Sequence, residues 1–250
     1  MRALQYGGAA LRHELKFYIG WQEYKLIRAN LAPVLSLDEN TKNPEGYLIR
    51  SLYFDDMYDT AMFEKLVGVQ RRDKYRIRIY DYSDKIIKFE CKSKYDAYIS
   101  KTSAGISRAQ TEAILGGDYS SLLTSGNPLL RDIYIKRNTV LLRPAVVVDY
   151  LREAYIYRAG NVRITFDKDV RAGVGSFDIF SRELPTYPVV ERDQMVLEIK
   201  YDDYLPTLIR GLVKSLTGDA SAISKYVMCR SRLADIQTVS KRVVTSINGR

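Results

Sequence analysis

Histidine, cysteine and tryptophan are all scarce in this chain of 250 residues, which holds one histidine, two cysteines and one tryptophan. The single histidine, His13, argues against a histidine-based catalytic triad and against a His-rich metal site. The two cysteines, Cys91 and Cys229, lie far apart in the sequence. This spacing argues against a disulfide scaffold and favours a reducing compartment, so we expect a cytoplasmic protein.

Long apolar runs are missing as well. No stretch approaches the ~18 consecutive apolar residues that a membrane-spanning helix needs, and the N-terminus lacks the apolar run of a secretory signal. There is no glycine-rich phosphate loop of the Walker type, no internal repeat and no linker. We therefore expect one domain over residues 1–250, with a core at residues 10–236 and a polar tail after Val239 that frays.

Positive charge is in excess. Lysine and arginine together number 39 against 30 aspartates and glutamates, which gives a net charge of +9. This excess indicates an anionic partner and leaves nucleic acid, a phosphate chain or an acidic membrane face open. The 20 tyrosines, most of them in strand-like segments, favour a β-rich fold.

The most informative pattern is a predicted hairpin over residues 72–94, which turns at residues 81–84. Cations occupy every second position of both strands, and apolar residues such as Ile77 and Phe89 lie between them. Because strand side chains alternate between faces, one face is cationic and the other is apolar. The cationic face carries seven cations, namely Arg72, Lys74, Arg76, Arg78, Lys88, Lys92 and Lys94. Only Glu90 balances them, so the hairpin repels itself unless it binds a multiply charged anion, and polyphosphate-type ligands fit best.

The same alternation recurs on other predicted strands. Their charged faces carry Glu14 with Lys16, Tyr150 with Arg152, Arg163 with Asp167 and Asp169, and Glu198 with Lys200. A solvated outer face would explain one such strand, but the predicted helices carry apolar stripes that must cover a sheet face. If the helices cover the apolar faces, the charged faces line a common interior. We therefore predict an α+β fold, an antiparallel β-barrel tunnel with a basic, polar interior and helices packed outside.

Hydrophobic periodicity and capping residues place the remaining elements. Strands are predicted at residues 12–19, 47–55, 98–102, 145–152, 154–157, 162–170 and 195–201. Helices are predicted at residues 21–31, 58–67, 107–115, 129–138, 206–216 and 224–236. Ser107 and Ser224 are suitable N-caps for two of these helices.

Short motifs follow one another between residues 10 and 235. They are Arg12-His13-Glu14-Leu15-Lys16-Phe17, Ser51-Leu52-Tyr53-Phe54-Asp55, Arg72-x-Lys74-x-Arg76-x-Arg78-x-Tyr80, Phe89-Glu90-x-Lys92, Tyr150-Leu151-Arg152-Glu153-Ala154-Tyr155, Val162-Arg163-Ile164-Thr165-Phe166-Asp167, Leu197-Glu198-Ile199-Lys200 and Ser224-Lys225-Tyr226. In this order they resemble the VTC domain, the polyphosphate polymerase domain of the vacuolar transporter chaperone complex. That family belongs to the triphosphate tunnel metalloenzyme superfamily. A single motif carries little weight, and the order over nearly the whole chain makes the resemblance specific.

The resemblance implies a tunnel with basic walls, one divalent cation, and ATP as the phosphoryl donor. The family's phosphate-binding positions are held here by Lys16, Arg76, Arg78, Lys92, Lys101, Arg152, Arg163 and Lys225. Tyr150 and Ser224 match positions that contact the nucleotide or its phosphates, and Glu198 matches the metal-binding glutamate. From this set we predict as catalytic residues Arg76, Arg78, Lys92, Arg163 and Lys225.

The charged faces extend this set. Lys74 and Lys200 share faces with the other cations, so we expect both to bind substrate phosphates. Mn²⁺ or Mg²⁺ is usually held by one or two carboxylates together with substrate phosphates. Glu14 and Glu90 are therefore candidate metal ligands beside Glu198.

Three further residues receive structural interpretations. Asp167 is expected to orient an arginine. His13 falls on the opposite face from Glu14, so we interpret it as structural. Cys91 lies on the apolar face of the hairpin and is expected to be packed and inert.

Two positions depart from the patterns of the superfamily. Its triphosphatases and cyclases carry Glu-x-Glu-x-Lys on the first strand, and Arg12 replaces the first glutamate here. This replacement argues against the hydrolase branch. The family's polymerases, as aligned, have a lysine shortly before Ser-Lys, where this chain has Ala222.

We predict a metal-dependent phosphotransferase, a polyphosphate polymerase that transfers the γ-phosphate of ATP to a growing chain. The acceptor phosphate is already anionic, so no strong general base is needed, which agrees with the scarcity of histidine. A tunnel triphosphatase acting on inorganic or nucleoside triphosphate, and a non-catalytic receptor for polyphosphate or nucleotides, stay open as alternatives. The expected partners are ATP and polyphosphate rather than nucleic acid, because the cations face inward. The sequence leaves open a membrane-protein partner and the oligomeric state.

Overall fold

Ten strands form one antiparallel sheet in the computed structural model, which describes residues 5–6, 9–41, 43, 45–96, 98–214, 216 and 218–248. The main path of the sheet runs through β3 (His13–Gly20), β12 (Gln194–Tyr201), β10 (Val162–Gly173), β9 (Arg143–Tyr157), β5 (Tyr47–Asp55), β6 (Arg71–Tyr80), β7 (Ser83–Tyr95) and β8 (Tyr98–Gly105). Beside this path, β4 (Ser36–Leu37) pairs with β9, and β11 (Thr186–Pro188) pairs with β10. A separate ribbon joins β1 (Gln5–Tyr6) to β2 (Ala9–Ala10).

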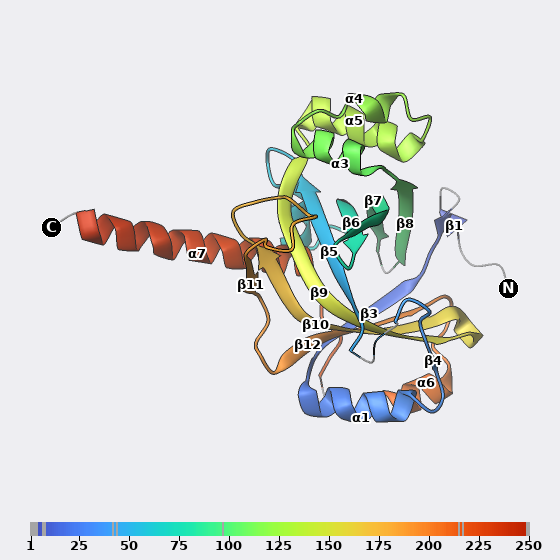
Figure 1. The fold of residues 1–250 in the computed structure, drawn as a ribbon. Helices are drawn as coiled ribbons and strands as arrows, with labels where there is room; N and C mark the ends of the chain where they lie inside the picture. The colour runs from blue at the N-terminus through green and yellow to red at the C-terminus, as the bar shows by residue number, and fades with distance from the viewer. Residues whose placement is uncertain are drawn as a thin grey trace.

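The two ends of this path meet. Arg12, directly before β3, and Ile99 of β8 exchange two backbone hydrogen bonds of 3.1 Å each. The sheet therefore wraps around an interior, and Figure 1 shows its strands curving between the helices at the top and bottom of the view. This arrangement is the predicted antiparallel tunnel.

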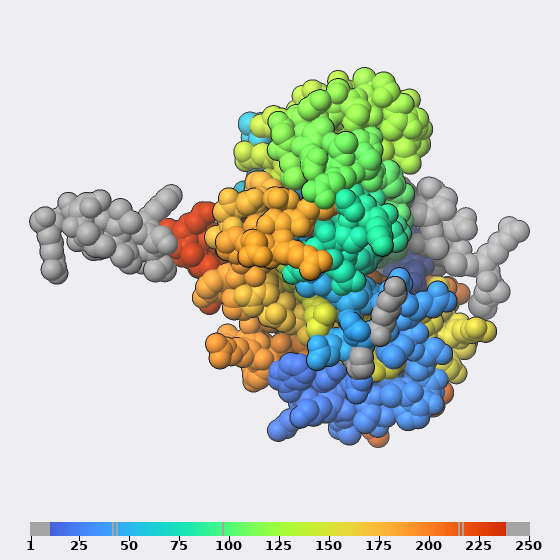
Figure 2. Space-filling model, in the orientation of Figure 1, coloured from blue at the N-terminus to red at the C-terminus, as the bar shows by residue number. Residues whose placement is uncertain are grey.

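Two groups of helices cover the apolar outer faces of the sheet. The helices of the described residues are α1 (Trp21–Leu31), α2 (Thr60–Leu66), α3 (Arg108–Leu115), α4 (Ser120–Leu123), α5 (Pro128–Val140), η1 (Ala159–Asn161), α6 (Thr207–Leu212) and α7 (Lys225–Asn248). One core joins Phe89 of the hairpin to Ile114 and Ile133 of α3 and α5. A second core joins Ile27 of α1 to Leu197 of β12. Because the apolar faces are used outside, the charged faces are left to the interior, and Figure 2 shows the two helical groups on opposite sides of the barrel.

The first turns of α7 lie against the inner face of the barrel. Tyr226 and Cys229 pack in a third cluster with Tyr53, Val146 and Val148, whose strand positions face inward. Ser224 Oγ accepts a hydrogen bond from Val227 N, as expected for the N-cap of this helix. Among the described residues, no helix is long and apolar enough to cross a membrane.

The hairpin of β6 and β7 closes through a tight turn. Asp81 and Tyr82 have φ values of 50° and 59°, and β7 begins directly after them, at Ser83. Two central residues with positive φ match the right-handed twist of the flanking strands, as in a type I′ turn. The predicted hairpin is confirmed, with a loop shorter than residues 81–84.

Several predicted boundaries are wrong. The region predicted as two strands, split at Glu153, is the single strand β9. Its Glu153 is buried on the outer face but accepts hydrogen bonds from Tyr24, Arg28 and Tyr155, so its charge does not interrupt the strand. Helix α6 ends at Leu212 rather than at residue 216, and α7 continues to Asn248 rather than ending at residue 236.

Asp169 does not lie on the charged inner face that the alternation predicted. The register between β10 and β9 shifts between Lys168 and Arg171, and Asp169 has a φ of 47°. Its side chain is exposed and pairs with Arg171 at 3.2 Å. The bulge moves this residue off the inner face because one extra residue changes the alternation.

Candidate functional site

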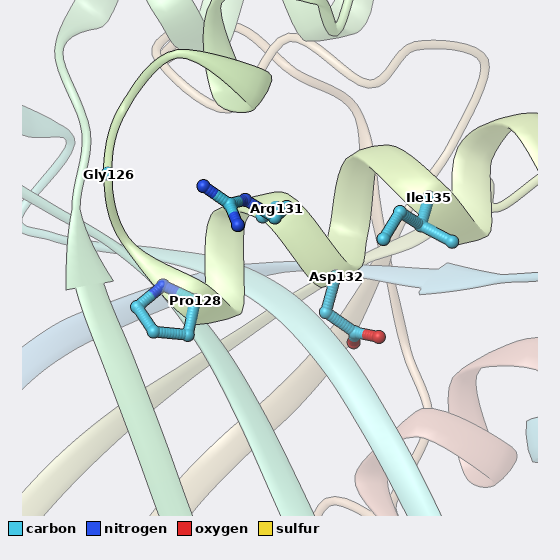
Figure 3. A pocket seen from close by; sticks show the side chains of 5 residues that line it. All are labelled: Gly126, Pro128, Arg131, Asp132 and Ile135. Carbon is cyan, nitrogen blue, oxygen red and sulfur yellow. The ribbon is translucent and has the colours of Figure 1, made fainter.

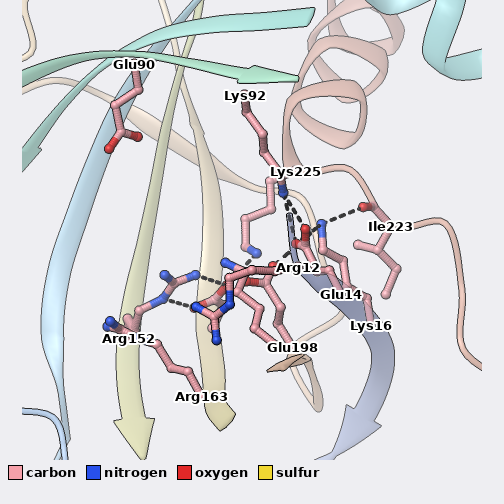
Figure 4. Close-up of polar contacts among 12 residues, drawn as sticks. Arg12, Glu14, Lys16, Glu90, Lys92, Arg152, Arg163, Glu198, Ile223 and Lys225 are labelled. Carbon is pink, nitrogen blue, oxygen red and sulfur yellow. Dashed lines mark hydrogen bonds and ion pairs between the residues drawn. The ribbon is translucent and has the colours of Figure 1, made fainter. Parts of the chain in front are cut away.

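Pairing between strands brings the predicted charged residues together inside the tunnel. Glu198 of β12 lies opposite Lys16 of β3, and Lys200 lies opposite Glu14. On the other side of β12, Arg163 lies opposite Lys200. The antiparallel register thus places lysines, an arginine and two glutamates from three strands on one inner surface (Figure 4).

The carboxylates of Glu14 and Glu198 form the centre of this group. Lys16 Nζ lies 3.1 Å from Glu14 Oε1 and 3.6 Å from Glu198 Oε2, and Lys92 Nζ lies 2.6 Å from Glu14 Oε2. Lys200 pairs with Glu198 Oε1. Burial alone would raise the pKa of Glu198, but Lys200 and Lys16 hold that pKa well below its usual range. Both glutamates are therefore carboxylates at neutral pH, despite being almost completely buried.

Glu14 and Glu198 fit a divalent cation that also binds substrate phosphates. They lie close enough for the charge of Glu198 to raise the pKa of Glu14, and Glu198 Oε1 forms its ion pair with Lys200 without hydrogen-bond geometry. In the described part of the chain, no group of three or more His, Cys, Asp or Glu residues gathers as a metal site. A cation held here would take most of its ligands from substrate oxygens, as Mg²⁺ commonly does.

Glu90, the third predicted metal ligand, has different neighbours. Its carboxylate accepts from Arg76 Nε at 2.8 Å and from Lys101 Nζ at 3.0 Å, and Arg78 lies 3.9 Å away. Although burial opposes this, Arg76 and Arg78 hold the pKa of Glu90 below its usual range. Its contacts favour a role in neutralising arginines, and Figure 4 shows it apart from Glu14 and Glu198.

Two guanidinium groups of β6 point into the tunnel. Arg76 donates to the Tyr53 hydroxyl at 3.0 Å as well as to Glu90. Arg78 donates to the Tyr150 hydroxyl at 3.0 Å and to Ser51 Oγ at 3.3 Å. These partners fix the arginines in place while leaving them near the inner surface, where they can grip phosphate.

The other two arginines are held from β9 and β10. Arg152 makes a two-pronged contact with Asp167, with distances of 2.6 and 2.8 Å, so Asp167 orients an arginine as predicted. Arg163 Nη2 lies 2.8 Å from Asp38 and donates to the Tyr47 hydroxyl at 3.1 Å. Figure 4 shows Arg152 and Arg163 reaching the cluster from the side opposite Lys92.

The start of α7 contributes the last predicted residues. Lys225 Nζ lies 2.5 Å from Asp167 Oδ2 and 4.9 Å from the centre of the Tyr150 ring. Ser224 Oγ accepts a hydrogen bond of 2.8 Å from Lys74 Nζ. The α7 end is also tied to the wall, because Lys16 Nζ donates to the carbonyl of Ile223 at 3.2 Å.

Two lysines of the hairpin are held in an environment that disfavours their charge. Burial, then Lys16 and Lys92, lower the pKa of Lys74 to about 6. Burial lowers the pKa of Lys92 to about 7, although the attraction of Glu14 opposes this shift. The interior therefore holds more cations than its carboxylates neutralise, which is the environment of a site for anions.

Two buried side-chain polar atoms of β10 lack a hydrogen-bond partner among the described residues. They are Thr165 Oγ1 and Arg163 Nε, and Thr165 lies directly opposite Glu198 of β12. Buried polar groups are rarely left unsatisfied, so such a cluster calls for a missing partner such as a bound ligand.

Sequence reasoning missed several residues of this surface. Tyr47, Ser51 and Tyr53 share one face of β5 and Thr165 lies between charged residues of β10, but none is charged, so charge alternation could not select them. Their positions alone could have selected them, because each lies an even number of residues from an inward-facing residue of the same strand. Asp38 follows β4, outside every predicted element.

Two residues near Glu14 have partners outside the group of Glu14 and Glu198. Arg12 shares the parity of Glu14, but its side chain pairs with Asp202 at 3.0 Å. His13 lies 5.0 Å from the ring centres of both Tyr98 and Tyr201, an aromatic contact that agrees with the structural interpretation. Cys91 is buried, and burial raises the pKa of its thiol to about 11, as expected for an inert cysteine.

A surface hollow lies away from the tunnel. It has a volume of about 230 Å³ and is lined by Gly126, Pro128, Arg131, Asp132 and Ile135 (Figure 3). The Tyr75 hydroxyl donates a hydrogen bond of 2.8 Å to Asp132. Arg131 is the single cation among the five lining residues. The hollow offers nothing comparable to the charge density of the tunnel.

Comparison with known proteins gives a family and a fold. A search of curated proteins finds no match. A putative adenylate cyclase from Bacillus halodurans, solved by crystallography, is similar with a TM-score of 0.51 and 15% identity, over 86% of this chain and 96% of that chain. The PH1012 protein from Pyrococcus horikoshii OT3 gives a TM-score of 0.48 at 12% identity, over 87% of this chain and 98% of that chain. The model of the VTC domain matches residues 11–234, so this chain belongs to the VTC domain family and has its triphosphate tunnel fold.

Proposed function

We propose that this protein is a polyphosphate polymerase that transfers the γ-phosphate of ATP to the end of a polyphosphate chain inside the tunnel. The observation that carries the proposal is the surplus of cations over carboxylates on the inner surface, together with the unsatisfied polar atoms of Thr165 and Arg163. Such a surface favours a ligand with many negative charges along its length. Membership of the VTC domain family supports the same ligand class.

The arginines would hold the transferring phosphoryl group. Phosphoryl transfer needs positioned cations around the equatorial oxygens more than it needs covalent help from the protein. Arg76, Arg78 and Arg163 are already oriented by neighbouring hydroxyls and carboxylates, so little rearrangement is required when phosphate arrives. Lys92 and Lys225 would add point charges from β7 and α7.

The remaining residues would position the substrates. Lys16, Lys74, Lys101, Arg152 and Lys200 would bind phosphates along the wall, and Tyr150 and Ser224 would contact the nucleotide or its phosphates. Glu14 and Glu198 would hold Mn²⁺ or Mg²⁺, which neutralises phosphate charge when bound.

The acceptor makes a general base unnecessary for this reaction. A terminal phosphate of the chain is already an anionic nucleophile, so no proton must be removed from it. The surface instead needs cations that offset the repulsion between two anionic reactants. Lys74 and Lys92, whose pKa values lie at about 6 and about 7, would regain their charge as the anions approach.

Hydrolysis is the second candidate. It is favoured by the adjacent carboxylates of Glu14 and Glu198, because paired carboxylates can orient an attacking water. The side chain of Arg12, where superfamily hydrolases have another glutamate, pairs with Asp202 and does not add a carboxylate to the group. A receptor that binds polyphosphate without reacting is the third candidate.

One assay separates these functions. The protein is incubated with ATP and either Mn²⁺ or Mg²⁺, and ADP, free phosphate and chain products on a gel are followed together. A polymerase gives ADP and a ladder of chains with little free phosphate. Phosphate release equal to ATP loss would instead establish a triphosphatase, and bound but unconsumed ATP would establish a receptor.

A further inference from the structure

Like charges face each other directly across the hairpin. Arg72 of β6 lies opposite Lys94 of β7, and Lys74 lies opposite Lys92. Directly opposed residues have Cβ atoms about 4.5–5.5 Å apart, and like charges at that spacing destabilise a sheet. Glu14 relieves Lys92, whereas Arg72, Lys74 and Lys94 make no ion pair with any carboxylate of the described residues.

A lysine from a helix joins this group. Helix α2 packs on β6, and its Lys65 lies near enough to Arg72 and Lys94 for both to lower its pKa, after burial as the main cause. We call Lys65, Arg72 and Lys94 the cationic rim. All three are half-buried rather than fully solvated, so the repulsion among them is only partly screened.

The carboxylates around the rim do not neutralise it. Glu64 attracts Arg72, and Asp96 attracts Lys94, but burial still lowers the pKa of both cations. The rim is also continuous with the tunnel, because Arg72 lies two residues before Lys74 on the same face of β6. From Arg78 to Arg72 this face carries a cation at every second residue over about 20 Å, at roughly 3.3 Å per residue.

We propose that Lys65, Arg72 and Lys94 bind the phosphates of a chain longer than triphosphate, continuing the path that starts between Lys74 and Lys92. This inference rests on the proposed function and adds to it a binding surface for the part of a polyphosphate chain that extends past the tunnel wall beside the start of α7. Phosphates of the chain supply the counter-charge that the rim lacks. A triphosphate held at the carboxylate pair of Glu14 and Glu198 does not need the rim.

The neighbouring surface offers a competing occupant. Helix α2 exposes Phe63, Leu66 and Val67, with 63%, 62% and 57% of their surface accessible. Apolar residues beside cations also suit an anionic lipid surface. The row of cations on β6 favours a linear anion, because Lys74 and Arg76 of the same row lie inside the barrel, where a lipid surface does not reach.

The test compares two anions and two variants. The rim variant is Lys65→Gln, Arg72→Gln and Lys94→Gln, and the control variant is Lys25→Gln, Lys85→Gln and Arg131→Gln, three exposed cations distant from the rim. Each variant loses three charges. Binding of inorganic triphosphate and of long-chain polyphosphate is measured by calorimetry over a range of salt concentrations, with circular dichroism as the check on folding.

The rim variant is expected to bind long-chain polyphosphate roughly tenfold more weakly. Each partly exposed ion pair adds only a small amount of binding free energy, and the variant loses three of them. Its affinity for triphosphate stays within about twofold of the unmodified protein, and its salt dependence for the long chain becomes shallower because fewer counterions are released. The control variant keeps both affinities. Because opposed cations are removed, the rim variant should also melt at a higher temperature.

Three other outcomes would contradict the rim site or the proposed function. Unchanged binding of the long chain, or equal loss of triphosphate and long chain, overturns the rim site. Retained polyphosphate binding with lost binding to vesicles containing phosphatidylserine assigns the rim to a membrane and also overturns it. If the unmodified protein binds no triphosphate, the proposed function itself fails, independently of the rim.

Discussion

Two regions of this molecule bury charge in opposite ways. Outside the barrel, Arg50 is 1% exposed and saturates its guanidinium with both oxygens of Asp149 and the carbonyls of Ile179 and Ser181. Inside the tunnel, Lys74 contacts a serine hydroxyl and an aromatic ring, and no carboxylate of the described residues forms an ion pair with it.

The difference separates structural from functional charge. A buried ion costs free energy unless its partners replace the lost water, so a structural pair is balanced. An unbalanced group persists only where a ligand completes it or where selection for function tolerates the cost. The tunnel, with lysines of lowered pKa and unsatisfied polar atoms on β10, belongs to the second kind.

Breaking the balanced side should have the largest effect on stability. Glu153 accepts from Tyr24, Arg28, Tyr155 and Lys168, so Glu153→Ala leaves buried donors and a lysine without a partner. We expect a loss of about 3–5 kcal/mol in the free energy of unfolding, as for other broken buried pairs. Urea denaturation followed by circular dichroism measures it. A loss below about 1 kcal/mol would show that the network is not a structural unit.

Breaking the unbalanced side should remove function and spare the fold. Arg78→Ala and Glu198→Gln each remove a charged group that faces the tunnel, away from the two outer cores. Loss of one preorganised group typically raises a reaction barrier by roughly 3–4 kcal/mol, so we expect at least about a hundredfold lower turnover of ATP. The melting temperature is measured alongside. Near-normal turnover in either variant contradicts the assignment, and unfolding of Arg78→Ala would make Arg78 structural.

Completing the unbalanced side with an anion should stabilise the protein. A ligand at about 100 times its dissociation constant adds roughly 2.7 kcal/mol to the free energy of unfolding. For a chain of this size, that corresponds to a rise of about 5–10 °C in the melting temperature. Thermal melts at low salt with triphosphate check this, and citrate serves as the anion control. Absence of any shift with triphosphate would argue against the basic tunnel as a phosphate site.

The period-two alternation of charged and apolar residues predicted most of the fold. The pattern of β6 and β7 assigned both faces of the hairpin correctly, because charged and apolar residues cannot exchange faces without burying charge in the outer core. The same rule failed at Asp169, since a bulge that changes parity leaves no mark in residue type. The predicted break at Glu153 is wrong for another reason, because distant residues such as Arg28 satisfy the buried charge there.

The candidate site was harder to predict from the sequence than the fold. Charged inward residues such as Lys16 and Glu198 could be selected from alternation and family resemblance, and the structure brings them together. Their ion-pair partners depend on which strands become neighbours, and no local pattern reports that choice. The separation of Glu90 from Glu14 is an example, because it follows from the order of strands around the barrel.

The smallest expected effect concerns the pH dependence of stability, and it tests the unbalanced side without any ligand. The pKa of Lys74 is about 6 in the folded protein, lowered by burial and by Lys16 and Lys92, against about 10.4 in an unfolded chain. Between these values the unfolded state binds more protons, so the contribution of Lys74 to stability rises as pH increases from 6 to 10.

Lys74→Met removes the group that titrates and keeps an apolar side chain of similar length. The variant should therefore melt at a higher temperature than the unmodified protein near pH 6, and this advantage should shrink towards pH 10. Melting temperatures of both proteins across this range measure the difference, and Lys25→Met, at an exposed site on α1, is the matched control with no such trend. A constant difference between Lys74→Met and the unmodified protein at every pH would mean that Lys74 keeps its charge in the empty tunnel. The cation surplus would then be screened by water rather than held in reserve for an anion.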